Sequence, residues 1–184
     1  MSHSPLRIRK AAVLGAGVMG AQIAAHLTNA GVETLLFDLP AKDGPKSSVA
    51  IKAIDHLRKL KPSPLAYRSA EKSIIPANYD ENLDWIKDCD LIIEAIAERM
   101  EWKLDLYHKI APFLPARAVI ASNTSGLSIN ALAEALPDEL RHRFCGVHFF
   151  NPPRYMHLVE VIPAKTTDAA VLAGLEAFLT TTLG

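Results

Sequence analysis

A histidine and a glutamate twelve residues apart are the side chains of this sequence best suited to acid–base chemistry. His148 ends an apolar run and Glu160 lies in the next one. Histidine can take up a proton near neutral pH because its unperturbed pKa is about 6.5. A carboxylate within an apolar strand should be paired, and a contact with His148 would fix the imidazole tautomer and raise its basicity. The spacing alone leaves open a buried histidine beside an unrelated surface glutamate. Four other histidines are poorer candidates, because His3 lies in a polar lead-in and the other three fall inside helical patterns: His26, His56 and His108.

A glycine-rich turn is the second chemical feature. Gly15–Gly20 follows the apolar run Ala11–Leu14 and opens onto a helical pattern. In that order, Gly15 allows the tight turn, Gly17 lets the backbone approach a pyrophosphate, and Gly20 lets the helix pack on the strand. The start of the helix offers free N–H groups and the positive end of its dipole to an anion. The residues of this turn predicted to contact a dinucleotide are Gly15, Gly17, Val18, Met19 and Gly20.

An acidic residue closes the second apolar run. Asp38 follows Thr34–Phe37, about 20 positions beyond the turn, where a carboxylate can accept hydrogen bonds from an adenosine ribose. A glycine turn that only packs tightly is the alternative. The strand before the turn, the helix after it and the acid at the end of the second strand together favour dinucleotide binding.

The alternation of strand and helix patterns predicts an α/β fold, namely a Rossmann-type, doubly wound, mostly parallel sheet with helices on both faces. Strands are expected at residues 10–14, 32–37, 90–96, 118–121, 144–148 and 157–162. Residues 42–79 are expected to be less regular, apart from one helix within them. Helices are expected at residues 19–30, 47–60, 82–86, 98–113, 129–136 and 167–181. Trp102, Leu106 and Ile110 form an apolar stripe on one of them. A polar cluster, Ser122–Gly126, follows a strand end, which is where open α/β sheets bind ligands.

The composition is that of an ordinary soluble globular domain. The 184 residues are 49% hydrophobic and 22% charged, with a formal net charge of zero. This balance gives no indication of a nucleic-acid or membrane-surface partner. Cys89 and Cys145 lack a metal-like spacing, so we expect no metal site and two small buried residues in a reducing compartment. Because no segment has the pattern of a signal peptide or a transmembrane helix, a cytoplasmic location is expected.

One segment departs from this neutrality. Residues 42–72 carry eight Lys or Arg against three acidic residues. Such an excess is typical of a solvated helix face, and it also suits a docking surface for an anionic, phosphate-bearing substrate.

Taken together, the motifs resemble the NAD-binding domain of L-3-hydroxyacyl-CoA dehydrogenases. The resemblance extends from about Arg9 to Gly184. Residues 151–155 and 61–65 are similar to large bacterial multifunctional members of fatty-acid β-oxidation. The motifs that carry the resemblance are Gly15–Gly20 with Asp38, Glu98–Lys103, Ser122–Ser125, His148–Pro152 and Leu158–Val161.

The resemblance implies roles for these residues. His148 would be the general base toward the 3-hydroxyl group, Glu160 would orient it, and Ser125 would hydrogen-bond the substrate oxygen at C3. Asp38 implies NAD as the cofactor in preference to NADP. The basic segment 42–72 takes the place of the family's projecting helical arm, which contacts coenzyme A. The residues implied to lie near the nicotinamide ribose or to line the same cleft are Glu98, Lys103, Asn123 and Asn151.

Members of this family continue into a helical domain that completes the acyl cleft and usually mediates dimerisation. Residues 1–184 are therefore expected to be the NAD-binding domain alone, with a dimer expected for the parent protein and weak turnover for the isolated chain. Two other functions remain open. One is a dehydrogenase of a short free 3-hydroxy acid, which would more often use a lysine base, and the other is a non-catalytic NAD(H)-binding module.

Overall fold

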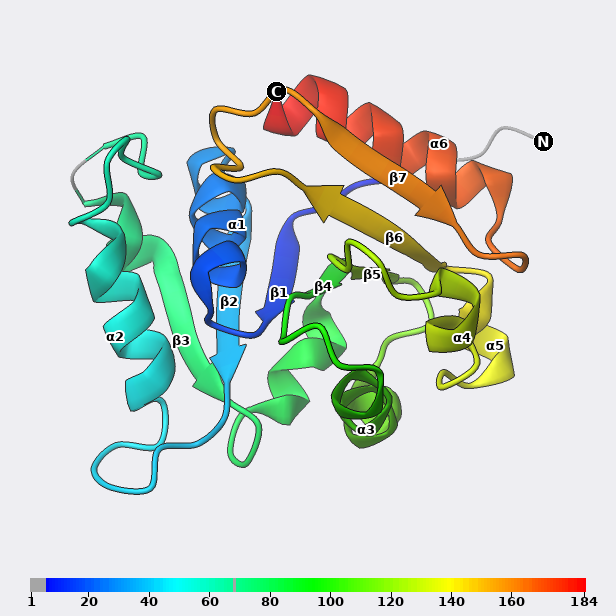
Figure 1. Cartoon of the computed structure of the whole chain (residues 1–184), viewed down its shortest axis with the longest axis horizontal. Coiled ribbons are helices and arrows are strands. Elements are labelled where there is room, and N and C mark those ends of the chain that lie inside the picture. Colours follow the sequence, from blue (N-terminus) through cyan, green and yellow to red (C-terminus); the bar gives the residue numbers. More distant parts are fainter. Residues whose placement is uncertain (1–5, 68) are drawn as a thin grey trace.

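A seven-stranded sheet forms the centre of the computed structural model, which describes residues 6–67 and 69–184 (Figure 1). The strand order is β3-β2-β1-β4-β5-β6-β7, and every neighbouring pair is parallel except the antiparallel pair β6 and β7. The chain moves outward from β1 in one direction and then resumes beside β1 with β4, as in doubly wound sheets. The strands are β1 (Lys10–Leu14), β2 (Glu33–Asp38), β3 (Ile74–Asn78), β4 (Leu91–Glu94), β5 (Val119–Ser122), β6 (Phe144–Phe149) and β7 (Val159–Pro163).

Helices cover both faces of this sheet, and the core is divided accordingly into two apolar clusters (Figure 1). Alternate residues of a strand point to opposite faces, so a strand buried on both sides is apolar on both, as β1 is from Ala11 to Leu14. One face is covered by α1 (Val18–Asn29), α2 (Ser48–Leu57) and α6 (Ala169–Phe178). The other is covered by α3 (Met100–Ile110), α4 (Ile129–Ala133) and α5 (Asp138–Arg141). The Rossmann-type fold predicted from the sequence is confirmed.

The main departure from the predicted elements is β3. No strand was expected in residues 61–79, yet Ile74–Asn78 pairs in parallel with β2 along its whole length. Pro76 within the run argues against a strand, since proline cannot donate a ladder hydrogen bond. Because β3 is the outermost strand on its side of the sheet, the missing N–H is tolerated there. The short helix α5 was also missed, and the helix expected at residues 129–136 ends at Ala133.

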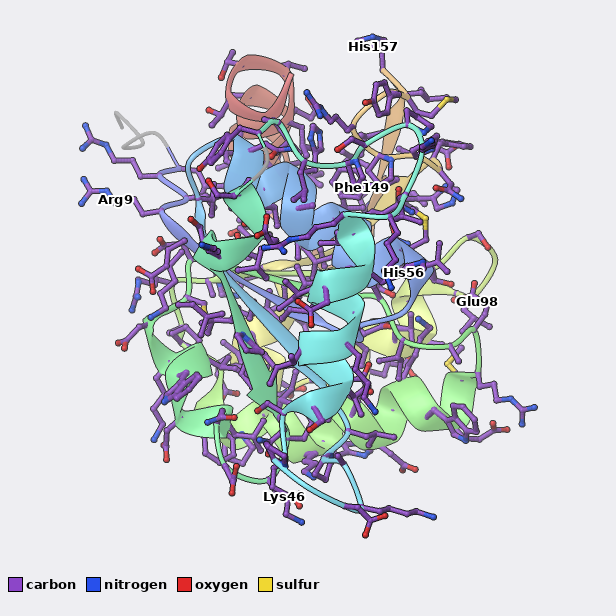
Figure 2. The ribbon with its side chains drawn as sticks, turned by 90° about the vertical axis from the view of Figure 1, so that its left-hand side faces the viewer. Arg9, Lys46, His56, Glu98, Phe149 and His157 are labelled. Carbon is purple, nitrogen blue, oxygen red and sulfur yellow. The ribbon has the colours of Figure 1, made fainter. Side chains whose placement is uncertain are left out.

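The basic segment is partly integrated into the core. Helix α2 buries Ala50, Ile54 and Leu57 on the same side of the sheet as α1. The remainder of the helix faces outward, as the side chains in Figure 2 show around His56. His3, and Arg68 of the basic segment 42–72, lie outside the described part of the chain.

Both cysteines are buried and reduced, as the sequence predicted. Burial raises the pKa of the Cys89 and Cys145 thiols to about 12 in each case. Both therefore remain protonated and unreactive at neutral pH. Within residues 6–67 and 69–184, none of the helices has the length and apolar composition needed to cross a lipid bilayer.

Candidate active site

Glycine is needed for a different reason at each of the three glycine positions of the turn. Gly15 has a φ of +110°, and a Cβ there would lie 2.8 Å from the carbonyl oxygen of Ala95. A Cβ on Gly20 would lie 1.8 Å from the carbonyl oxygen of Gly15, so only glycine lets α1 start this close to β1. A Cβ on Gly17 would meet no protein atom within 4 Å. The protein itself therefore does not require glycine at position 17, whereas a ligand lying against the backbone would.

Asp38 fixes this turn from the end of β2. Its Oδ2 accepts a hydrogen bond from the Ala16 N–H at 2.6 Å, and its Oδ1 accepts one from the Leu39 N–H at 2.7 Å. An ionised carboxylate has about four acceptor positions, so both oxygens can still accept hydroxyl groups. The carboxylate thus lies where the sequence predicted, beside the turn and ready to accept hydrogen bonds from ribose hydroxyls.

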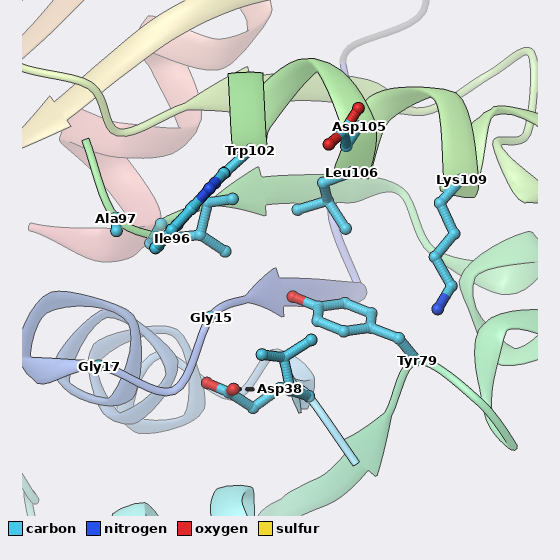
Figure 3. A pocket seen from close by; sticks show the side chains of 12 residues that line it. Gly15, Gly17, Asp38, Tyr79, Ile96, Ala97, Trp102, Asp105, Leu106 and Lys109 are labelled. Atoms are coloured by element: carbon cyan, nitrogen blue, oxygen red, sulfur yellow. Dashed lines mark hydrogen bonds between the residues drawn. The ribbon is translucent and has the colours of Figure 1, made fainter. Parts of the chain in front are cut away.

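A pocket of about 450 Å³ opens beside the turn and Asp38 (Figure 3). Trp102 was expected on the buried stripe of α3, but its side chain is 52% exposed and lines this pocket, while Leu106 and Ile110 are buried. Sequence reasoning did not identify the rest of this lining, because those residues are apolar, lie in the less regular segment, or are charged residues that looked like the solvent face of a helix. The side chains that line the pocket together with Asp38 are Leu39, Tyr79, Ile96, Trp102, Asp105, Leu106 and Lys109.

His148 and Glu160 meet across β6 and β7. They are register partners in the antiparallel ladder, and His148 Nδ1 lies 2.7 Å from Glu160 Oε2. A carboxylate at this position favours the tautomer in which Nδ1–H donates to Glu160, which leaves the Nε2 lone pair free to take up a proton. The His148 ring also packs on Phe150, with 4.6 Å between ring centres. The His148 side chain is 18% exposed and that of Glu160 is 52% exposed.

Glu98 organises the polar loop that follows β5. Its Oε1 accepts hydrogen bonds from the N–H groups of Ser125 and Gly126, both at 3.0 Å, and from the Thr124 hydroxyl. Burial by itself raises the pKa of Glu98, but these hydrogen bonds and the nearby Lys103 charge outweigh burial, and the pKa lies below its ordinary value. Ser125 is exposed on this loop. Ser122 of β5 is the register partner of Gly146 of β6. The loop after β5 and His148 of β6 therefore lie close together, near the carboxyl ends of neighbouring strands.

Lys103 lies beneath this loop in a buried polar network. Its side chain is 1% exposed, and its Nζ is 2.5 Å from Glu94 Oε1 and 3.6 Å from Glu98 Oε2. Glu94 is fully buried and also accepts hydrogen bonds from Tyr107 and Ser122. Sequence reasoning missed Glu94, although an acid at the end of the apolar run Leu91–Ile93 is the expected signal of a paired buried charge. A direct contact of Lys103 with the cofactor remains a prediction.

The two asparagines join separate parts of the site. Asn123 Oδ1 accepts a hydrogen bond from the Phe149 N–H at 2.9 Å, which ties the loop after β5 to the end of β6. Asn151 Oδ1 accepts one from Gln22 Nε2 at 3.1 Å, which ties the loop after β6 to α1. Asn123 follows β5 and Asn151 follows β6, so both lie near the carboxyl ends of these two neighbouring parallel strands. Their contacts with a cofactor remain predictions.

These features define a class of protein. An open backbone position at Gly17, an acid at the end of β2, and an apolar pocket between them fit a dinucleotide, and the residues present therefore suit NAD. A histidine–carboxylate pair at the same edge adds an acid–base function. The molecule is a nicotinamide-dinucleotide-binding domain of the Rossmann type.

Comparison with known proteins identifies the family. Residues 10–183 match the model of the 3-hydroxyacyl-CoA dehydrogenase NAD-binding domain, and the chain belongs to this family. It is 44% identical over 178 residues to a putative fatty acid oxidation complex trifunctional enzyme of Rickettsia felis, and 41% identical over 180 residues to a probable 3-hydroxyacyl-CoA dehydrogenase of Deinococcus radiodurans. Among solved structures it is similar to 3-hydroxybutyryl-CoA dehydrogenase of Escherichia coli, with 32% identity and a TM-score of 0.80.

These matches cover nearly all of this chain but only part of its relatives. They include 96% of the chain and 25% of the Rickettsia protein, and 97% of the chain and 52% of the Deinococcus protein. The structural match covers 97% of this chain and 37% of the Escherichia coli chain. The family resemblance and the NAD cofactor predicted from the sequence are confirmed.

Proposed function

We propose that this chain supplies the NAD site and the acid–base pair of an enzyme that interconverts L-3-hydroxyacyl-CoA and 3-ketoacyl-CoA. The contact between His148 and Glu160 carries the proposal, because a domain that only binds NAD(H) has no use for an oriented histidine at the sheet edge. The activities named for the relatives support the same reaction.

In the direction of alcohol oxidation, His148 Nε2 takes the proton of the 3-hydroxyl group as the C3–H bond breaks. The glycine turn and Asp38 would hold NAD, whose nicotinamide would supply the acceptor for the hydride from C3. Glu160 holds the Nδ1–H and balances the positive charge that develops on the imidazole. The Ser125 hydroxyl, on the loop held by Glu98, donates a hydrogen bond to the C3 oxygen. The proton and the hydride together account for the two hydrogens that leave the alcohol.

Coenzyme A would dock beside the basic segment of residues 42–72. The proline-rich part of this segment is fastened to the loop that follows β6, because the Arg154 guanidinium donates to the Ser63 and Leu65 carbonyls. The Tyr155 hydroxyl also donates to the Ser63 carbonyl at 2.7 Å. The basic segment is thereby placed next to the chain that carries His148, which is where the thioester end of an acyl-CoA must arrive.

We also propose that residues outside this chain complete the acyl cleft and mediate dimerisation in the parent protein. The exposure of Glu160 supports this, since a carboxylate that balances charge acts more strongly when water is excluded. The relatives have the additional length that such a domain needs. The cytoplasmic location expected from the sequence stays a prediction.

A dehydrogenase of a free 3-hydroxy acid with a lysine base has less support. Lys103 is buried and bonded to Glu94, so it is not available as a base.

The test is the acetoacetyl-CoA-dependent oxidation of NADH, followed by its absorbance. We would compare the 184-residue chain with any longer natural chain that contains it. Turnover by the longer chain, and much weaker turnover by the 184 residues, is expected. Equal turnover by both would contradict the incomplete cleft. Tight NADH binding without ketone reduction by either chain would contradict the reaction.

A further inference from the structure

Tyr79 brings a hydroxyl group to the pocket beside the glycine turn. It directly follows β3, its side chain is 4% exposed, and its N–H donates to the Asp38 carbonyl at 3.3 Å. The ring stacks on Phe37 with 5.9 Å between ring centres, and Lys109 Nζ lies 5.9 Å from the Tyr79 ring centre. The ring is therefore held in place by its packing, independently of its hydroxyl.

The hydroxyl oxygen of Tyr79 is buried and has no hydrogen-bond partner among the described residues. The other deeply buried tyrosine behaves differently, because the Tyr107 hydroxyl is bonded to Glu94. Buried tyrosine hydroxyls ordinarily find a partner, since leaving one unpaired is costly. In Figure 3 the hydroxyl end of Tyr79 points into the pocket, toward Gly15 and above Asp38.

The pocket around this hydroxyl suits a flat heterocycle attached to a ribose. Leu39, Ile96 and Leu106 provide apolar walls, and Asp38 provides the acceptor for ribose hydroxyls. Burial, together with the charges of Asp38 and Glu94, raises the pKa of Tyr79 well above its ordinary value. The group consequently remains a hydroxyl at any pH at which the protein would be used.

We propose that the Tyr79 hydroxyl forms a hydrogen bond with the adenosine half of NAD and thereby contributes to the affinity for this cofactor. No existing protein hydrogen bond has to be broken when it forms, so its strength adds directly to affinity. The inference rests on the proposed function only for its cofactor and does not depend on the acyl-CoA substrate.

The test is Tyr79→Phe in the 184-residue chain, with dissociation constants measured by calorimetry for NADH and for ADP-ribose. Both constants should rise about fivefold, the usual net value of one hydrogen bond. The melting temperature of the ligand-free variant should be no lower than that of the wild type, because the lost hydroxyl was unpaired. Tyr155→Phe is the matched control, since its hydroxyl bonds the Ser63 carbonyl, and it should leave both constants unchanged.

Unchanged constants in Tyr79→Phe would overturn the proposal, as would a loss seen for NADH but not for ADP-ribose. An equal loss in Tyr155→Phe would overturn it too. Because no acyl-CoA is present, these results are independent of whether the chain reduces a 3-ketoacyl thioester. A chain that binds NADH as expected but reduces no ketone would contradict the proposed function alone.

Discussion

His148 and Glu160 are facing register partners of β6 and β7, so backbone pairing itself sets the contact between their side chains. Facing residues on one side of an antiparallel pair have their Cβ atoms about 4.5–5.5 Å apart, within easy reach of an imidazole and a carboxylate. A shift of one residue in this register would turn Glu160 to the other face of the sheet. The acid–base pair is therefore a product of strand pairing, and its precision depends on β7 staying in register.

The first prediction concerns this pair. Glu160→Gln keeps the shape of the side chain but removes the charge that balances the imidazolium, so kcat for acetoacetyl-CoA reduction should fall roughly 10- to 100-fold. The KM for NADH should stay within about twofold, because Glu160 lies on the edge strand β7, separated by β4, β5 and β6 from β1 and the glycine turn that follows it. Steady-state kinetics of whichever chain turns over measures both. Glu139→Gln, at an exposed position of α5, is the control and should leave kcat unchanged. A wild-type kcat in Glu160→Gln would contradict the role assigned to Glu160.

The second prediction separates two glycines of the turn. Gly17→Ala places its methyl group in open space, so the free energy of unfolding should change by no more than about 1 kcal/mol, while the Kd for NADH should rise at least about tenfold. Gly20→Ala drives a methyl group into the Gly15 carbonyl and should destabilise the chain by about 2 kcal/mol or more. Urea unfolding and NADH titration measure these quantities. The opposite ranking of the two variants in unfolding free energy would refute this account of the turn.

A third prediction concerns the loop that carries Ser125. In Glu98→Ala the N–H groups of Ser125 and Gly126 lose their acceptor, and their amide hydrogen exchange should accelerate by roughly tenfold. Glu101→Ala, on the exposed side of α3, should leave these amides unchanged. Exchange resolved by NMR is the measurement, and equal protection in both variants would show that Glu98 does not hold the loop.

The charge of Glu98 also gives this loop a pH dependence. Because its folded pKa is lowered from 4.5, the carboxylate stabilises the folded chain above the unfolded pKa. That contribution is lost as the pH falls through the lower folded value. The protection of the Ser125 and Gly126 amides that Glu98 provides should therefore be constant at neutral pH and decline only when the pH falls below the ordinary carboxyl value of 4.5.

The fourth prediction concerns His26 on α1. Burial and the nearby positive charge of Arg154 lower the His26 pKa from 6.5 to about 4. Between these two values the unfolded chain binds the proton more strongly, so stability falls as the pH drops. From pH 7 to pH 5 this group should cost about 2 kcal/mol of unfolding free energy.

Urea unfolding at pH 7 and pH 5 tests this expectation. His26→Gln should remove most of the decrease in unfolding free energy between pH 7 and pH 5 that His26 causes. His56→Gln, at an exposed position of α2, should retain this decrease. If the His26→Gln chain loses as much stability on acidification as the wild type, His26 is not the titrating group.

Much of this fold could be predicted from the sequence because its signals are local. The glycine turn, the apolar parallel strands and the acid at the end of β2 each depend on short stretches of chain, and the structure places them as expected. The strand β3 could not be predicted, since its identity depends on an edge position that makes Pro76 acceptable. That information lies in the sheet order rather than in the segment itself.

The contact between His148 and Glu160 was predicted from the sequence, but the reason given for it was incomplete. Glu160 was expected to pair because it was expected to be buried, yet its side chain is half-exposed and the pairing comes from the strand register. The argument from burial applies to Glu94, which is fully buried and has four polar partners. Trp102 and Tyr79 were not predicted to line the pocket. The sequence pattern around them does not distinguish a side chain that lines a pocket from one that is buried in the core.

Asp38 has a consequence for how this domain could acquire a different cofactor. The carboxylate that would repel a 2′-phosphate is the same group that holds the Ala16 N–H of the turn. Exchanging it for a basic residue, or for any residue without a hydrogen-bond acceptor, would loosen the loop against which either dinucleotide must bind. A change of cofactor preference in this fold therefore requires at least two coordinated substitutions. One would accommodate the 2′-phosphate, and the other would replace the lost acceptor for the Ala16 N–H. A single replacement of this kind at Asp38 would give a variant that binds either dinucleotide poorly. The hydrogen bond from Ala16 to Asp38 therefore hinders a stepwise evolution of cofactor preference.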